Sequence, residues 1–331
     1  MRLLRALVVV TVLALVALGA VTFVWYRQPL TLPASPFEFE VRPGATLSAV
    51  ARQLRDAGVI AHPYALIALA RVKGVDRTIK AGSYEVGEGI TLPQLLAKLT
   101  QGDVTQSSLM IVEGTTFAEL MRTLGEMREI THTLTDVPDT ELLTRLGIME
   151  KSPEGLFFPD TYFFANGSTD AALLKRANRA LDERLRAGWE RRSPDLPFAT
   201  PYEALILASI VEKETGRPTD RPLIASALVN RLKRGMRLQV DPAVIYGIGE
   251  KFDGNLRKRD LEADSAYNTY VREGLPPTPI ALPSQASLDA VLNPPPTPYL
   301  YFVSRGDGTS EFSSTLAEHN RAVSKYQKGG R

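Results

Sequence analysis

The sequence predicts an α+β protein in which one N-terminal transmembrane helix precedes two globular units. Three observations lead to this prediction. An uncharged apolar run near the N-terminus is long enough to cross a bilayer. Hydrophobic residues make up 44% of the 331 positions, which is enough for two cores of ordinary size. The strand and helix patterns after the run lack the βαβ alternation of a doubly wound sheet, which indicates mixed α+β units.

The predicted membrane anchor covers residues 6–26 and follows a short N-terminus, residues 1–5. The run contains no charged side chain, and its 21 residues match the thickness of a bilayer's hydrocarbon core. Arg2 and Arg5 precede the run, and Trp25 and Tyr26 end it as an aromatic anchor. The positive-inside rule therefore places the N-terminus in the cytoplasm and the bulk of the chain outside it. A cleaved signal peptide is the alternative, but the run exceeds the usual length of its apolar segment.

Composition excludes several classes of protein. The chain has no cysteine, which excludes disulfides, thiolate catalysis and cysteine-ligated zinc. The formal net charge is +2, with both signs interspersed, so we do not expect nucleic-acid binding. The three histidines are scattered, and we expect neither a metal site nor a cofactor.

The first folded unit is predicted over residues 37–105, after an extended, proline-containing linker over residues 27–36. Alternating residues 37–41 predict a strand, and Thr46 can cap a helix that ends near Gly58. A second helix, a strand over residues 80–86 and a helix that ends near Gly102 follow. This order resembles a LysM-type module, a small fold that binds N-acetylglucosamine polymers. A spacer domain without a ligand is the alternative, because likeness of fold does not establish a site.

The second unit is predicted over residues 106–331. A strand is expected over residues 109–112, and amphipathic helices follow from residue 117 and around residues 142–146. Residues 171–192 form the clearest charged amphipathic helix. Further strands are expected around residues 157–164 and 299–304. This mixture without internal repeats completes the α+β prediction.

Residues 202–214 predict a helix on which the chemistry could lie. Its side chains are apolar on nearly all faces, so it should be buried, and Glu212 and Glu214 lie at its end. Both acids prolong apolar stripes, but two residues of separation turn them about 200° apart, so they cannot share one site. Burial under apolar side chains raises the pKa of a carboxyl group and suits it to act as a general acid. Alternatively, both acids pair with basic neighbours. Those neighbours are Lys213, Arg217 and Arg221.

Short motifs follow one another in a fixed order through the second unit. They are EGLFFPDTY (154–162), ASIVEKET (208–215), NRL (230–232), GMRLQVDP (235–242), VIYG (244–247), YNTY (267–270), GLPP (274–277), ASL (286–288), NP (293–294), YLYFV (299–303) and EHN (318–320). Together they resemble the endolytic murein transglycosylase (YceG-like) family. The resemblance covers essentially the whole chain, including the anchor and the LysM-like unit.

The resemblance implies a single-pass protein of the bacterial inner membrane with a periplasmic lytic transglycosylase domain. Such an enzyme cleaves the MurNAc-GlcNAc β-1,4 bond within peptidoglycan glycan strands and leaves 1,6-anhydro-MurNAc ends. By position, Glu212 is the catalytic acid, which protonates the glycosidic oxygen and then accepts the proton of the muramyl C6 hydroxyl as that oxygen attacks C1. One carboxylate can suffice, because the substrate's hydroxyl replaces water. By analogy, the partners extend to peptidoglycan synthases (penicillin-binding proteins).

The matching motifs also imply a set of substrate-binding residues, whose polar and aromatic side chains suit sugar hydroxyls and pyranose rings. The set is Gln239, Asp241, Tyr246, Asn268, Tyr270, Glu154 and Asp160. Structural alternatives exist, because Asp241 can open a helix, Asn268 can satisfy loop backbone and Asp160 can form a turn. His319 is expected to be a hydrogen-bonded structural histidine. Val240 occupies a position where the family pattern has threonine, which puts a contact by that side chain in doubt.

Two other functions are compatible with the same residues. A membrane-anchored scaffold could bind glycan and recruit cell-wall synthases without cleaving the strand. A muramidase would cleave the same bond by hydrolysis. Product mass distinguishes hydrolysis from transglycosylation, because only hydrolysis adds water to the new end.

Overall fold

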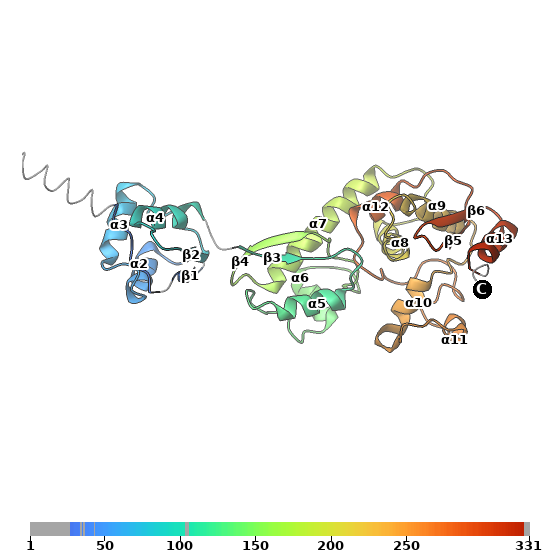
Figure 1. Cartoon of the computed structure of the whole chain (residues 1–331), viewed down its shortest axis with the longest axis horizontal. Coiled ribbons are helices and arrows are strands. Elements are labelled where there is room, and N and C mark those ends of the chain that lie inside the picture. Colours follow the sequence, from blue (N-terminus) through green and yellow to red (C-terminus); the bar gives the residue numbers. More distant parts are fainter. Residues whose placement is uncertain (1–26, 34, 36, 43, 103–105, 328–331) are drawn as a thin grey trace, which may run out of the picture. The chain divides into compact units, whose positions relative to one another are not determined.

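The computed structural model describes residues 27–33, 35, 37–42, 44–102 and 106–327. Contacts divide the chain into two compact units (Figure 1). The N-terminal unit comprises residues up to Ser107 together with Phe163–Ser168, and the C-terminal unit comprises Ser108–Tyr162 and the residues from Thr169 onward. The predicted membrane helix at residues 6–26 lies outside the described residues. Within the described residues, no helix combines the length and apolar character needed to cross a membrane.

The N-terminal unit has the strand–helix–helix–strand order expected from its sequence, followed by a further helix. Its elements are β1 (Phe37–Val41), α2 (Leu47–Asp56), α3 (Pro63–Val72), β2 (Gly82–Val86) and α4 (Leu92–Gln101). The two strands are antiparallel, with Phe39 opposite Tyr84. Both side chains are buried, and their rings stack with centroids 5.6 Å apart. The resemblance of this unit to a LysM-type module stays a prediction.

The start of the predicted linker belongs to this unit. Pro29 forms an isolated antiparallel bridge with Thr91. The Leu30 backbone N–H donates to the Ile90 carbonyl at 2.7 Å, and the Leu30 side chain packs against the unit's core. The chain is therefore attached to the folded unit only a few residues after the apolar run ends.

The elements after α4 are helices and short strand pairs, and all of them lie in the C-terminal unit except β3 and β4, which each contain residues of both units. In chain order, the remaining elements are β3 (Gln106–Met110), α5 (Phe117–Glu126), α6 (Asp139–Leu146), β4 (Thr161–Ala165), α7 (Asp170–Glu190), α8 (Pro201–Glu214), α9 (Arg221–Lys233), α10 (Asp241–Ile248), η1 (Gly249–Lys251), α11 (Lys258–Glu262), α12 (Gln285–Leu292), β5 (Tyr301–Ser304), β6 (Ser310–Ser313) and α13 (Leu316–Tyr326). β3 pairs with β4, and β5 pairs with β6 in an antiparallel hairpin. These separate two-stranded sheets among helices confirm the α+β class.

Helix α8 lies at the centre of the C-terminal unit. Thr200 caps its N-terminus by accepting a hydrogen bond from the Glu203 N–H, and Pro201 occupies the first helical position. Residues 204–211 are all buried, as the apolar pattern predicted. Helices α7, α9, α10 and α12 all contact α8, and α12 also contacts α9 (Figure 1). The end of α8 is thus fixed by packing on several sides.

The loop that carries the EGLFFPDTY motif packs tightly against a later loop. Phe157 and Phe158 are buried, and Phe157 stacks on Phe117 with centroids 5.4 Å apart, so these rings form core. Gly155 has φ of +78°, and a Cβ there would overlap the ring of Pro279. Only glycine permits both this backbone conformation and this approach.

Candidate active site

The last turn of α8 presents two carboxylates to two different environments. Glu212 faces the N-terminus of α12, whereas Glu214 lines a cavity formed with α9, the residues that open α10, and the β5, β6 and α13 segment. This separation agrees with the angle of about 200° that two helical residues span. The two carboxylates therefore have different neighbours.

The Glu212 carboxylate is held by hydrogen bonds from α12. Its Oε2 accepts from the Ser284 backbone N–H at 3.0 Å, from the Ser284 hydroxyl, and from the Ser287 hydroxyl at 2.6 Å. Its Oε1 lies 3.7 Å from the Arg221 guanidinium, and the Glu212 side chain is only 7% exposed. Ser284 is also the N-cap of α12. Glu212 therefore ties the end of α8 to the start of α12.

The Glu214 carboxyl lines a cavity of about 440 Å³. Burial raises its pKa to about 7, and the nearby Asp241 carboxylate adds to this rise, whereas the Arg231 guanidinium opposes it. A carboxyl group with this pKa is protonated in a large fraction of molecules near neutral pH. The cavity thus contains a group that can donate a proton and, after donation, accept one.

Asp241 and Tyr270 form a pair on the wall of the same cavity. The Tyr270 hydroxyl donates to Asp241 Oδ1 at 2.5 Å. Burial raises the pKa of the Tyr270 hydroxyl, and its hydrogen bond to Asp241 adds to the rise, so the hydroxyl keeps its proton. Asp241 also opens α10, as the structural alternative for this residue anticipated. The two residues come from separate motifs and meet only in the folded chain.

Arg231 shapes the loop that carries Gln239. This arginine is 7% exposed and donates to the backbone oxygens of Leu300 at 2.6 Å and Leu238 at 2.8 Å. It also contacts the Gln239 side-chain oxygen at 3.4 Å. Gln239 has φ of +51°, a conformation that is uncommon for residues other than glycine. Arg231 lies within the NRL motif, but nothing in the sequence pattern indicated that it would line the cavity.

His319 lies in the same cavity and differs from its expected structural role. Its ring stacks on Tyr301 with centroids 5.2 Å apart. Its Nδ1 is buried and has no hydrogen-bond partner among the described residues. Burial lowers the pKa of His319, and the positive charge of Arg231 lowers it further, which favours a neutral ring. A neutral imidazole with a vacant ring nitrogen can donate to or accept from a bound ligand.

Glu154 and Tyr246 contact each other instead of lining the Glu214 cavity. Glu154 is 4% exposed, and its two oxygens accept from the Phe117 backbone N–H at 3.0 Å and the Tyr246 hydroxyl at 3.1 Å. Burial raises the pKa of Glu154 to about 7, although these hydrogen bonds oppose the rise. Tyr246 also packs edge-to-face against Tyr267 at 5.0 Å. The pair joins α10 to the EGLFFPDTY loop and α5.

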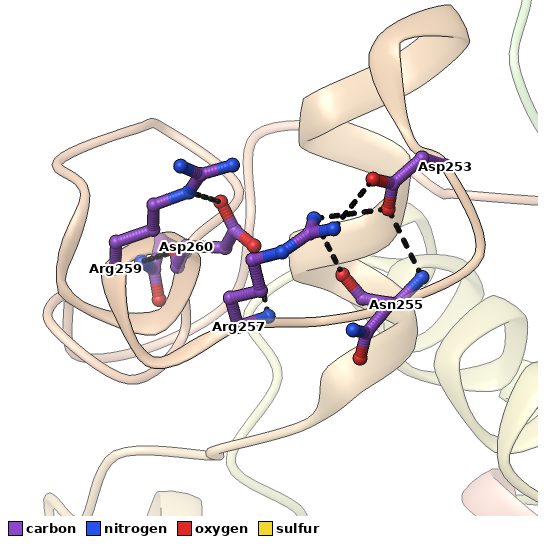
Figure 2. Close-up of polar contacts among 6 residues, drawn as sticks. Asp253, Asn255, Arg257, Arg259 and Asp260 are labelled. Atoms are coloured by element: carbon purple, nitrogen blue, oxygen red, sulfur yellow. Dashed lines mark hydrogen bonds and ion pairs between the residues drawn. The ribbon is translucent and has the colours of Figure 1, made fainter.

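Asn268 and Asp160 have structural contacts. Asn268 is 1% exposed, and its Nδ2 donates to the carbonyls that end α11. These carbonyls are Asp260 at 3.2 Å, Leu261 at 3.1 Å and Ala263 at 2.6 Å. Figure 2 shows the neighbouring contacts of Arg257 with Asp253 and Asn255, and of Arg259 with Asp260, which hold the chain before and within α11. Asp160 is largely exposed and accepts from the Thr161 N–H at the start of β4.

The structure thus gathers part of the predicted site around Glu214. Gln239, Asp241 and Tyr270 line its cavity. Glu154, Tyr246, Asn268 and Asp160 lie elsewhere in the C-terminal unit. Within the described part of the chain, no group of three His, Asp or Glu side chains is arranged to hold a metal ion.

Comparison with known proteins extends over both units. The model of the YceG-like family matches residues 39–325. An endolytic murein transglycosylase of Bacillus subtilis is 33% identical over 305 residues, which cover 86% of this chain and 82% of the relative. One of Streptococcus pneumoniae is 28% identical over 318 residues, covering 86% of this chain and 57% of the longer relative. The crystal structure of a YceG-like protein from Listeria monocytogenes has 28% identity and a TM-score of 0.55, covering 87% of this chain and 98% of that chain.

The family match covers most of the chain. The family match runs from within β1, the strand that opens the N-terminal unit, to within α13, the last helix of the C-terminal unit. It also includes both carboxylates of α8 and the residues that line the Glu214 cavity. The chain therefore belongs to the YceG-like family.

Proposed function

We propose that this chain is an endolytic murein transglycosylase in which Glu214 is the general acid and then the general base. The proposed substrate is the β-1,4 bond between N-acetylmuramic acid and N-acetylglucosamine within peptidoglycan glycan strands. The names of the similar proteins support the reaction class, and the position of Glu214 supports the assignment of the acid. Such an enzyme is a lyase, because it eliminates an alcohol from a glycoside without consuming water.

We choose Glu214 over Glu212 as the acid because the Glu214 carboxyl group is open to a cavity. Glu214 borders the cavity and has a pKa raised to about 7. Three hydrogen bonds from Ser284 and Ser287 and the nearby Arg221 guanidinium occupy the carboxylate of Glu212. A proton donor must come within hydrogen-bond reach of the leaving oxygen. The open carboxyl fits this requirement better than the occupied one.

The proposed reaction begins with protonated Glu214. Its proton passes to the glycosidic oxygen as the bond from that oxygen to C1 of the muramic acid breaks, which leaves an oxocarbenium-like centre. The resulting carboxylate accepts the proton of the muramyl C6 hydroxyl as the C6 oxygen attacks C1. The products are a 1,6-anhydromuramyl end and a free 4-hydroxyl on the N-acetylglucosamine, and Glu214 is again protonated. Because the nucleophile is intramolecular, its effective concentration is high.

The other cavity residues have roles that follow from their contacts. Asp241 fixes the Tyr270 hydroxyl and raises the pKa of Glu214 through its negative charge. Arg231 holds the loop that carries Gln239, whose exposed amide can meet sugar hydroxyls. The ring of Tyr270 offers an aromatic surface for a pyranose.

Hydrolysis is the second candidate, because the cavity holds a second carboxylate. In an inverting glycosidase, one carboxyl group is the acid and another activates water. Asp241 could have the second role only if it released the Tyr270 hydroxyl or shared it with water. The hydrogen bond of 2.5 Å between them favours a fixed pair, and with it transglycosylation.

Mass spectrometry of the products tests both the reaction and the acid. Full-length protein is incubated with intact glycan strands that lack pre-existing anhydro ends. We expect new anhydromuramyl ends from the wild type and from Glu212→Gln, and none from Glu214→Gln. Ends that carry an added water would establish hydrolysis. If both variants are folded, Glu214→Gln stays active and Glu212→Gln forms no anhydro ends, then Glu212 is the catalytic acid.

The proposal includes the predicted location of the chain. Residues 6–26 would anchor it in the bacterial inner membrane, with the catalytic unit on the periplasmic side, near nascent strands and the penicillin-binding proteins that make them. A non-catalytic scaffold would bind the strands but produce no new ends. The same product assay therefore separates an enzyme from a scaffold.

A further inference from the structure

Helix α3 has an apolar face that no described residue covers. The inner residues Leu66 and Ala70 are buried in the core of the N-terminal unit. On the opposite side, Tyr64 is 80% exposed and Val72 is 86% exposed, and Ala68 between them is exposed as well. Their spacing of four residues places the three on one face. A surface helix normally carries polar residues on its solvent-exposed side. The α3 outer face (Tyr64, Ala68 and Val72) is apolar instead.

Basic residues lie at the C-terminal end of the α3 outer face. Residues 42–80 contain seven basic and two acidic side chains, whereas the whole chain has a net charge of only +2. Arg71, Lys73 and Arg77 lie at and just beyond the end of α3. An exposed apolar stripe bordered by Lys and Arg is typical of a helix that lies in the interface of an anionic bilayer.

The chain reaches this unit directly from the apolar run. Residues 28–31 line a cavity of about 390 Å³ together with His62 and Ala65 at the start of α3. The run ends at Tyr26, and Pro29 is already paired with Thr91. Three extended residues span at most about 10 Å. If the run lies in the bilayer, the start of α3 lies close to the lipid surface, and α3 itself is only about 15 Å long.

We propose that the α3 outer face rests on the surface of an anionic membrane. Tyr64 and Val72 enter the headgroup region, and Arg71, Lys73 and Arg77 contact lipid phosphates. The inference goes beyond the proposed reaction and rests on the proposed anchor. It gives the N-terminal unit a fixed orientation on the bilayer. The basic border favours a lipid surface over a second copy of this chain, since two such faces would repel each other.

Site-specific fluorescence tests this contact, and the absence of cysteine makes the labelling clean. The full chain is reconstituted in phosphatidylglycerol-containing nanodiscs, with a single environment-sensitive dye at Val72→Cys. Arg52→Cys, on the exposed side of α2, is the matched control, and Leu15→Cys, within the apolar run, reports the anchor. Lipids that carry a spin label should quench the dyes at positions 72 and 15 but not the dye at position 52.

The possible quenching patterns distinguish the α3 contact from the anchor. Quenching at position 15 without quenching at position 72 overturns the α3 contact and leaves the anchor standing. No quenching at either position overturns both. A dye at position 72 that is shielded from aqueous quencher in lipid-free detergent, in a manner that depends on protein concentration, indicates self-association and overturns the lipid contact.

Charge variants test the lipid chemistry separately. Replacing Arg71 and Arg77 by glutamine should shift the balance from docked to undocked α3 by about fivefold per removed charge. Replacing Arg52, on the exposed side of α2, is the control and should have a smaller effect. Circular dichroism confirms that each variant is folded. Equal quenching in the Arg71 and Arg77 variants and in purely zwitterionic nanodiscs would contradict a role for anionic lipid.

Discussion

The two sides of the last turn of α8 differ in where their polar partners come from. On the α12 side, the protein itself supplies every partner of Glu212 through Ser284, Ser287 and Arg221. On the cavity side, Glu214 lies near the charges of Asp241 and Arg231 and lines a space that a ligand can enter. A carboxylate whose bonds are complete holds structure, and one whose environment is incomplete is available for chemistry. This contrast leads to testable expectations for activity, stability and pH dependence.

The largest effect expected is on turnover. Glu214→Gln removes the proton that both steps require, so the rate of formation of anhydro ends should fall by about a thousandfold or more. Glu212→Gln should change the rate per folded molecule by less than about tenfold, because this side chain positions α12 and does not meet substrate. Initial rates with defined glycan strands measure both. Equal losses in the two variants would abolish the proposed division of roles.

The next largest effect is expected on folding stability, where substitution of Glu212 should cost more than substitution of Glu214. Glu212→Leu leaves Arg221 buried without its carboxylate and leaves two serine hydroxyls without their acceptor, so unfolding free energy should fall by about 3 kcal/mol. Glu214→Leu removes a group that burial already destabilises and should cost less than about 1 kcal/mol. Urea unfolding followed by circular dichroism gives both values. A larger loss for Glu214→Leu would contradict the contrast.

The pH dependence of activity should report the raised pKa of Glu214. The acid must start protonated, so kcat/KM should fall about tenfold per pH unit above pH 7. The raised pKa of Glu214 also makes the stability of the folded state depend on pH. Between the unfolded-state pKa near 4.5 and the folded-state pKa of about 7, the folded state keeps the proton of Glu214 and the unfolded state releases it. The stability that this bound proton contributes is therefore complete below pH 4.5 and is lost as the pH rises to 7.

The corresponding stability measurement compares variants across this pH range. Glu214→Gln should gain stability relative to wild type by roughly 1–2 kcal/mol between pH 4.5 and 7. Glu154 titrates in the same window and with the same sign, so Glu154→Gln measures its separate contribution. A relative gain on acidification instead would show that the carboxyl of Glu214 is stabilised in its charged form.

The smallest effect concerns His319. His319 lines the cavity, and its buried Nδ1 has no hydrogen-bond partner among the described residues. If a ligand engages this nitrogen, His319→Leu should raise KM several-fold, which corresponds to the loss of about one hydrogen bond, with a smaller change in kcat. His319→Asn places an amide nitrogen close to the position of Nδ1 and should recover most of the affinity. Steady-state kinetics with short glycan strands separate the two parameters. If leucine and asparagine have the same effect, the ring serves packing against Tyr301.

Local sequence patterns predicted several elements closely and missed others, and they could not rank the two acids. Strand β1 and helix α8 agree with the predicted ranges to within one residue, because alternation and capping act over a few neighbours. Glu212 and Glu214 both prolong apolar stripes, so periodicity alone treats them alike. The distinction comes from Ser284 and Ser287, more than seventy positions later, and from the loop near Gln239. No local pattern contains such distant partners.

The path of the folded backbone also determines which of the predicted site residues line the cavity. Gln239, Asp241 and Tyr270 lie in motifs of the family resemblance and do line the cavity. Asn268 lies in the same motif as Tyr270, but its amide faces the end of α11, a difference that only the backbone path determines. His319 was expected to be satisfied, because a buried imidazole usually finds a partner. Its vacant nitrogen became visible only in the folded unit.

The bond between Glu212 and the start of α12 has a consequence for how the chain matures. Helix α8 is synthesised about seventy residues before Ser284, and at 5–20 residues per second this interval lasts several seconds. Until α12 arrives, the end of α8 lacks both its serine partners and part of its packing. A chain that is still being synthesised therefore lacks contacts that hold this end of α8, and with it Glu214, in place. We therefore expect the cleavage activity to appear only when synthesis is nearly complete.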